Sequence, residues 1–167
     1  MTDRYFGKYR GTVTDTGDPL ASGRIRARVP DVTGTGDTGW ALPCAPFAGS
    51  GMGFFALPPT GAAVWIEFEQ GDPDFPVWTG GWWATPTETP TQVLVPPQSG
   101  KVLLRTDGGS SILIDDTPGT GGITLSTASG QKIALTAISI EIDNGAGAKI
   151  TLSGPQVSIN NGALEVT

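Results

Sequence analysis

Two pairs of carboxylates are the side chains of this sequence best suited to acid–base chemistry or cation binding. Asp72 and Asp74 flank a proline, and Asp115 and Asp116 precede a Thr-Pro-Gly run. Paired carboxylates act as acid and base in glycoside hydrolysis, and carboxylate oxygens bind calcium. Both pairs fall in turn sequences, however, where aspartate side chains accept hydrogen bonds from the nearby backbone. We favour the turn role, assign no catalytic, cofactor-binding or metal-binding residue, and expect no cofactor.

A basic stripe and two adjacent tryptophans are the next candidates. Arg24, Arg26 and Arg28 alternate along one segment, and Trp82 and Trp83 follow a run of apolar residues. Such a stripe can bind phosphates, and tryptophans can stack on bases or sugars. A net charge of −6 argues against nucleic acid, which draws much of its affinity from basic side chains. We therefore interpret these five residues as contacts with a neighbouring subunit or another protein, and expect no nucleic-acid partner.

The composition of the chain predicts an all-β protein in two parts. Its 167 residues include 25 glycines and 14 prolines, and no segment shows a helical period. All the aromatic residues lie between Tyr5 and Trp83, so the two halves must build different cores. We expect one domain over residues 1–83, an extended Pro/Thr-rich linker over 84–99 and a second domain over 100–167.

The first half has the strand pattern of a small barrel. In Ala62–Glu69 apolar residues occupy every second position, and Gly71–Asp74 forms a turn before a second apolar run, which together predict a β-hairpin. Alternation in Gly23–Pro30 points Ile25, Ala27 and Val29 inward. Phe6–Val13 and Trp40–Pro43 supply two more strands. Five strands in about eighty residues suit an OB-fold barrel.

The second half repeats a simpler unit, a pair of aliphatic residues two positions apart between turn residues. Val102 and Leu104 form the first pair. The predicted core continues through Ile112, Ile114, Ile123, Leu125, Ile133, Leu135, Ile140, Ile142, Ile150, Leu152, Val157, Ile159, Leu164 and Val166. Eight short strands with two such residues each bury too little apolar surface for this half to fold alone. Three identical chains that meet on these aliphatic side chains would form a stable three-sided prism.

Four motifs in the first half, in this order, carry a resemblance to a known family. They are Gly11-Thr12-Val13, the Gly23–Pro30 strand GRIRARVP, Trp40-Ala41-Leu42-Pro43, and the hairpin from Val64 to Gly80 with its GDPD turn. The sequence over Gly7–Gly81 resembles the OB domain of phage baseplate spike proteins, called baseplate assembly protein V, and of type VI secretion spikes. The resemblance implies a five-stranded OB-fold barrel followed by a C-terminal intertwined trimeric β-helix.

The resemblance also implies a mechanical function. The protein would be a homotrimeric central spike of a contractile tail or injection-system baseplate, a structural protein and not an enzyme. It would dock on a baseplate hub protein and pierce the target cell envelope. Spikes of type VI secretion usually carry a large hub region before the OB domain; here a separate hub subunit is expected. We expect a PAAR-like tip protein at the C-terminal end, and assembly in the bacterial cytoplasm into a virion tail baseplate or injection particle.

Two other classes of function stay open from the residues alone. One is an OB-fold binding module for oligosaccharide or single-stranded nucleic acid on a β-stalk. The other is an envelope-degrading enzyme with a carboxylate pair in a groove, against which the lack of aromatic residues after Trp83 argues.

Overall fold

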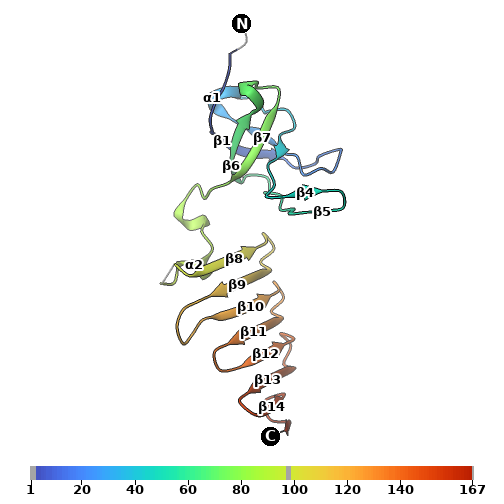
Figure 1. Cartoon of the computed structure of the whole chain (residues 1–167), viewed down its shortest axis with the longest axis vertical. Coiled ribbons are helices and arrows are strands. Elements are labelled where there is room, and N and C mark those ends of the chain that lie inside the picture. The colour runs from blue at the N-terminus through green and yellow to red at the C-terminus, as the bar shows by residue number, and fades with distance from the viewer. Residues whose placement is uncertain (1–2, 97–98, 167) are drawn as a thin grey trace. The chain divides into compact units, whose positions relative to one another are not determined.

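A computed structural model describes residues 3–96 and 99–166, with the side chains of 165 and 166 outside the description. The chain is all-β in its main elements, as predicted, and divides into two compact units, residues 1–88 and 89–167. Figure 1 shows the strands of each unit. Within the described residues, no helix is long and apolar enough to cross a membrane.

The N-terminal unit is a five-stranded barrel with the strand order β2-β1-β6-β7-β3. These strands are β1 (Tyr9–Asp15), β2 (Arg26–Arg28), β3 (Leu42–Pro43), β6 (Ala63–Phe68) and β7 (Pro76–Gly81). The two edges of the sheet meet where Ile25 and Ala41 exchange backbone hydrogen bonds of 3.2 and 2.8 Å. This contact closes the sheet, so its edge strands are paired.

Short elements complete the N-terminal unit. They are α1 (Pro30–Thr33), the two-stranded hairpin of β4 (Ala48–Gly49) and β5 (Met52–Gly53), and two 3₁₀ turns, η1 (Glu69–Gly71) and η2 (Pro86–Glu88). The first strand begins at Tyr9, later than the Phe6 of the sequence prediction. Gly7 precedes it with a φ of 91°, a left-handed conformation that a strand does not adopt.

The core of the barrel is formed by alternating aliphatic side chains. Ile25, Ala27 and Val29 are fully buried, which confirms the inward face predicted for this segment. Val64, Ile66 and Phe68 of β6 are buried with them, as the hairpin pattern indicated. The core cluster consists of Val13, Ile25, Ala27, Val29, Ala41, Val64, Ile66 and Phe68. A barrel of this size therefore buries one continuous apolar core of its own.

The segment predicted to be an extended linker contains two helical turns instead. These are η2 and α2 (Thr91–Leu94), and Pro86 and Pro90 stand at their N-terminal ends. Proline is tolerated there because the first N–H groups of a helix have no partner within it. Glu88 fixes the first turn, since its carboxylate accepts the backbone N–H of Ala84 at 2.8 Å. The high proline content predicted an extended backbone over the whole segment, whereas short helical turns occupy part of it.

The C-terminal unit is one antiparallel sheet in which consecutive strands are neighbours throughout (Figure 1). Its strands are β8 (Lys101–Arg105), β9 (Ser111–Asp115), β10 (Gly122–Ser126), β11 (Lys132–Thr136), β12 (Ile140–Asp143), β13 (Lys149–Ser153), β14 (Gln156–Ile159) and β15 (Leu164–Val166). Each strand holds one of the eight predicted aliphatic pairs. Turns with left-handed residues, such as Asn160 and Asn161, join the strands.

Candidate functional site: an uncovered aliphatic face

The aliphatic pairs of the C-terminal unit form two straight columns on one face of its sheet. Leu104 pairs with Ile112, and the same register continues strand by strand to Ile159 and Leu164. The second column starts at Val102 and Ile114 and ends where Val157 pairs with Val166. Directly opposed side chains on one face lie close enough to contact one another. The structure thus places the predicted core residues from Ile112 to Leu164 on a single face, and the side chain of Val166 lies outside the described part.

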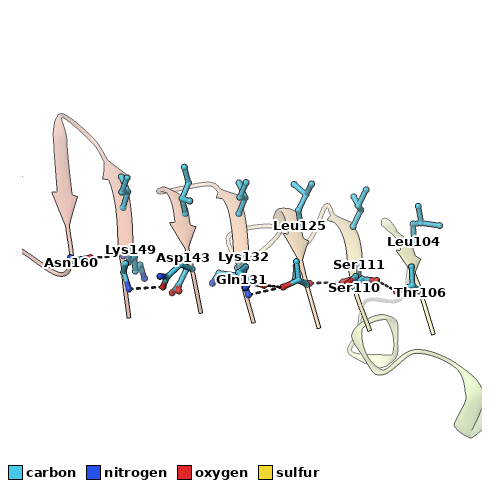
Figure 2. Close-up of a pocket in the computed structure, with 18 of the residues that line it drawn as sticks. Leu104, Thr106, Ser110, Ser111, Leu125, Gln131, Lys132, Asp143, Lys149 and Asn160 are labelled. Carbon is cyan, nitrogen blue, oxygen red and sulfur yellow. Dashed lines mark hydrogen bonds between the residues drawn. The ribbon is translucent and has the colours of Figure 1, made fainter. Parts of the chain in front are cut away.

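This aliphatic face is open in the single chain. The column side chains of β8 to β13 are 38–64% exposed, and Leu164 is exposed as well. Figure 2 shows column side chains, with Leu104 and Leu125 labelled, projecting to the same side of successive strands. Soluble proteins rarely expose continuous apolar surface over a whole sheet, and such surface marks an interaction site. The face therefore has the properties of an interface and not of a folded interior.

A row of polar side chains borders the column that contains Leu104, and together they line a groove of about 830 Å³. Thr106, Ser110 and Asn160, which Figure 2 labels near the ends of the strands, belong to this row. Its members bond to one another across strands: the Ser111 and Ser126 hydroxyls lie 2.9 Å apart, and Asn160 Oδ1 accepts the backbone N–H of Lys149 at 2.9 Å. These bonds fix the turns that end the strands, so the groove is a straight continuation of the aliphatic face.

The opposite face of the sheet is mixed and carries ion pairs. Glu141 accepts from Lys132 at 2.7 Å and from Lys149 at 2.6 Å, so one carboxylate joins three successive strands. The hydrogen bonds from these two ammonium groups lower the pKa of Glu141 below its ordinary value, and the bond from Lys132 has the larger effect. Ala134 is the one buried hydrophobic residue among the described side chains of this unit. The two faces therefore differ in chemistry, and only the aliphatic face lacks polar side chains along its columns.

The carboxylate pairs serve as turn formers, which agrees with the role favoured from the sequence. Asp72 accepts the backbone N–H of Asp74 at 3.2 Å and pairs with Arg4 at 3.1 Å. Asp115 accepts both the hydroxyl and the backbone N–H of Thr117, and these bonds lower the pKa of Asp115. Neither pair presents two free carboxylates to a common cleft.

The three arginines of the basic stripe are engaged within their own unit. Arg24 forms a two-pronged contact with Asp18, with nitrogen–oxygen distances of 2.9 and 2.6 Å. Its guanidinium and that of Arg26 both lie over the Trp40 ring, at 5.7 and 5.6 Å from the centroid. Arg28 pairs with Asp37 at 3.3 Å. Each of the three cations therefore contacts an acid or an aromatic ring of its own unit.

Asp18 organises the loop between β1 and β2. Its carboxylate accepts backbone N–H groups of Leu20 at 3.0 Å and Ser22 at 2.8 Å in addition to the Arg24 guanidinium. The bond from Arg24 is the largest cause that holds the pKa of Asp18 well below its ordinary value. This pairing is not visible in the sequence, where Asp18 has only the pattern of a turn residue before Pro19.

The two tryptophans proposed for an interface lie in different environments. Trp82 packs against Trp65 with ring centroids 5.7 Å apart, and the Arg10 guanidinium lies 4.9 Å from its ring. Its indole N–H is buried and has no partner among the described residues. Trp83 is 61% exposed and is free to contact another chain. The structure thus packs Trp82 against Trp65 and leaves Trp83 at the surface, whereas Arg24 and Arg26 contact a different ring, that of Trp40.

Comparisons with known proteins match both halves of the chain. Residues 9–83 match the family model of the type VI secretion system/phage-baseplate injector OB domain. Residues 101–165 match the model of the phage baseplate V C-terminal trimerisation domain. The actin cross-linking toxin VgrG1 of Vibrio cholerae serotype O1 is 41% identical over 68 residues, which are 41% of this chain and 6% of that protein. This relative is thus far longer than the chain.

The two matches explain the contrast between the units. An OB barrel with a closed core precedes a sheet whose apolar face is open, and the model matching that sheet describes a domain that trimerises. Both models describe domains of phage-baseplate or injector proteins. The chain belongs to the phage baseplate V family of spike proteins, which is related to type VI secretion spikes.

Proposed function

We propose that three copies of this chain close their aliphatic faces around a common axis to form the needle of a contractile injection apparatus. The observation that carries this proposal is the pair of aliphatic columns, in register over eight strands and exposed along β8 to β13 in the single chain. Covering a half-exposed leucine or isoleucine contributes about 1 kcal/mol. The twelve exposed column positions of β8 to β13 in each of three chains provide a large driving force for assembly.

The strand pairing suggests how the walls of the needle are made. Each strand of the C-terminal unit is hydrogen-bonded to the strands before and after it in the same chain. One chain can therefore supply one continuous wall, with its columns turned to the axis and its Glu141 ion pairs outward. Eight strands spaced by about 4.8 Å make a wall roughly 40 Å long.

The mechanical function follows from this construction. Backbone hydrogen bonds link every strand to the next along the shaft, so a force along the axis is resisted by the whole ladder and by the closed apolar core. When the sheath contracts, the needle is driven through the target cell envelope. This function requires no catalytic residue. The OB unit would dock on the hub, with Trp83 as the most accessible of the proposed contact residues, and a PAAR-like protein would cover the tip.

The experiment uses the assembled particle with an epitope-tagged spike. Particles carrying the intact chain should show the tag at the centre of the baseplate and should permeabilise target cells to a small dye on contraction. A chain with Leu125→Asp, whose charge faces the proposed axis, should abolish permeabilisation while Thr124→Asp on the opposite face preserves it. Equal dye entry with both variants would contradict a piercing role for the trimeric needle.

A further inference from the structure

An apolar hairpin projects from the barrel and is not explained by the needle. This arm, residues 44–57, contains β4 and β5 joined by a tight turn at Ser50 and Gly51 (Figure 1). Within the arm, the backbone pairs Ala48 with Gly53 and Gly49 with Met52, and the Phe54 N–H donates to the Phe47 carbonyl at 3.1 Å. At its base, the Cys44 N–H donates to the Trp78 carbonyl at 2.9 Å. An isolated two-stranded hairpin is marginally stable in water, so an arm this short requires a covering surface.

The arm presents large apolar side chains to solvent in the single chain. Phe47 is 55%, Met52 66%, Phe54 47% and Phe55 73% exposed. The Phe55 ring lies against Gly23 of the barrel and leaves most of its surface free. A groove of about 590 Å³ between arm and barrel is lined by Met52, Phe54 and Phe55 together with Pro43 and Trp78. Exposed apolar surface of this extent marks a contact site.

The chemistry of the arm restricts its occupant. None of residues 38–66 is charged, so the arm offers no electrostatic selection for a charged partner. It also lacks the lysine or proline residues within its strands that protect exposed strand edges from pairing. The surface that suits it is apolar and uncharged, and the groove beside the arm on a second copy of the chain has these properties.

The length of the connecting segment places such a second copy within reach. The N-terminal unit ends at residue 88, and the match to the trimerisation domain begins at residue 101. Thirteen residues span at most about 45 Å when fully extended. Three barrels tied in this way to one trimer are held at an effective concentration in the millimolar range, at which weak apolar contacts form.

We propose that the arm of each barrel packs against the barrel groove of the next copy, so that the three OB units form a closed ring. The proposal rests on the trimer of the proposed function. Three identical head-to-tail contacts close a ring with threefold symmetry and leave no unpaired arm. The uncharged, apolar character of residues 38–66 then has a structural purpose, which is to fix the three barrels as one collar.

The test is site-specific photocrosslinking in the purified full-length protein. The crosslinking amino acid benzoylphenylalanine is placed at Met52 in the arm or, as a matched control, at Phe75, an exposed apolar residue of the β6–β7 turn. Light scattering first establishes that each variant is trimeric. Illumination should link chains to one another only from position 52, and mass spectrometry should locate the linked peptide within residues 1–88 of another copy. Adding Phe54→Glu should lower the yield about tenfold, since the charge would have to be buried.

The outcomes separate this inference from the proposed function. A trimer that gives no chain-to-chain crosslink from position 52, or the same yield from positions 52 and 75, would overturn the collar and leave the needle intact. Crosslinks from position 52 that form only to an added hub protein would show that the hub is the occupant and would overturn it too. A monomer by light scattering would overturn both proposals.

Discussion

The two units of this chain use the same alternating strand pattern and reach opposite results. In the barrel, Ile25 and Ile66 are fully buried because the sheet curves and closes on itself. In the C-terminal sheet, Ile123 and Ile133 remain about 40% exposed because the sheet is open and no other described segment of its own unit covers its apolar face. Alternation with a period of two places aliphatic residues on one face of a sheet. Whether the same unit buries that face depends on whether the sheet closes into a barrel or stays open.

The difference concerns what each unit needs for stability. A closed barrel carries its own core, so its stability belongs to one chain. The sheet has apolar columns without a covering layer, so its stability depends on other chains. Substitutions of buried or column residues should therefore lower the unfolding stability of the single chain in the first unit. In the second unit they should weaken the association of the chains.

The largest expected effect comes from a charge on the aliphatic face. Leu125→Asp would place three carboxylates on the proposed axis, and burying an unpaired charge costs several kcal/mol. We expect the trimer to be lost. Light scattering measures it, with Thr124→Asp as the control because Thr124 lies next in sequence on the opposite face. A trimer that survives Leu125→Asp would show that this face is not the interface.

A cavity in the barrel should have a smaller and local effect. Ile66→Ala removes a fully buried side chain, and such truncations cost about 3 kcal/mol. Tryptophan fluorescence during urea unfolding reports on this unit alone, because all five tryptophans lie before residue 84. The midpoint should fall while the oligomeric mass is unchanged. An unchanged midpoint would mean that the barrel core does not limit the stability of this unit.

Acid should weaken the barrel through Asp18. Because the Arg24 contact depresses its folded pKa, Asp18 contributes stability fully above the unfolded pKa of about 3.9, and the contribution is lost as the pH falls through the folded value. Asp18→Asn should lower the urea midpoint at pH 7 by less than Ile66→Ala and should reduce the loss between pH 5 and pH 3. If the urea midpoint fell equally between pH 5 and pH 3 in the wild-type protein and in Asp18→Asn, Asp18 would be excluded as a cause of the acid destabilisation.

The smallest effect is expected from the outward ion pairs. Glu141→Gln removes the partner of Lys132 and Lys149, and a partly exposed pair of this kind contributes about 0.5 kcal/mol. The thermal midpoint of the trimer should drop slightly at low salt and hardly at all in 1 M salt, where such pairs are screened. A large drop at both salt concentrations would mean that Glu141 is buried by another chain.

The sequence predicted the strands more successfully than the side-chain contacts. Alternation identified the inward residues of Gly23–Pro30 and Ala62–Glu69, and the eight aliphatic pairs each lie on a strand. Both predictions rest on local periodicity, which a sequence displays directly. The pairing of Arg24 with Asp18 depends on how a loop folds back, and composition does not show it.

Tertiary context also decided where the aromatic residues lie. All of them lie before residue 84, yet among the described residues Phe68 is the only aromatic in the buried cluster. Phe47, Phe54 and Phe55 lie on the arm instead. The lack of charge over residues 38–66 was the available signal for that surface, but such a stretch is equally compatible with a buried segment.

The central claim, that the C-terminal sheet is completed by two further copies of itself, is tested most directly by molar mass. Light scattering would be measured for the full-length protein and for a chain lacking residues 100–167. We predict three times the 17.2 kDa chain mass for the full-length protein and a monomer for the truncated chain. A full-length monomer, or a truncated chain that stays trimeric, would contradict the claim that the aliphatic face holds the assembly together.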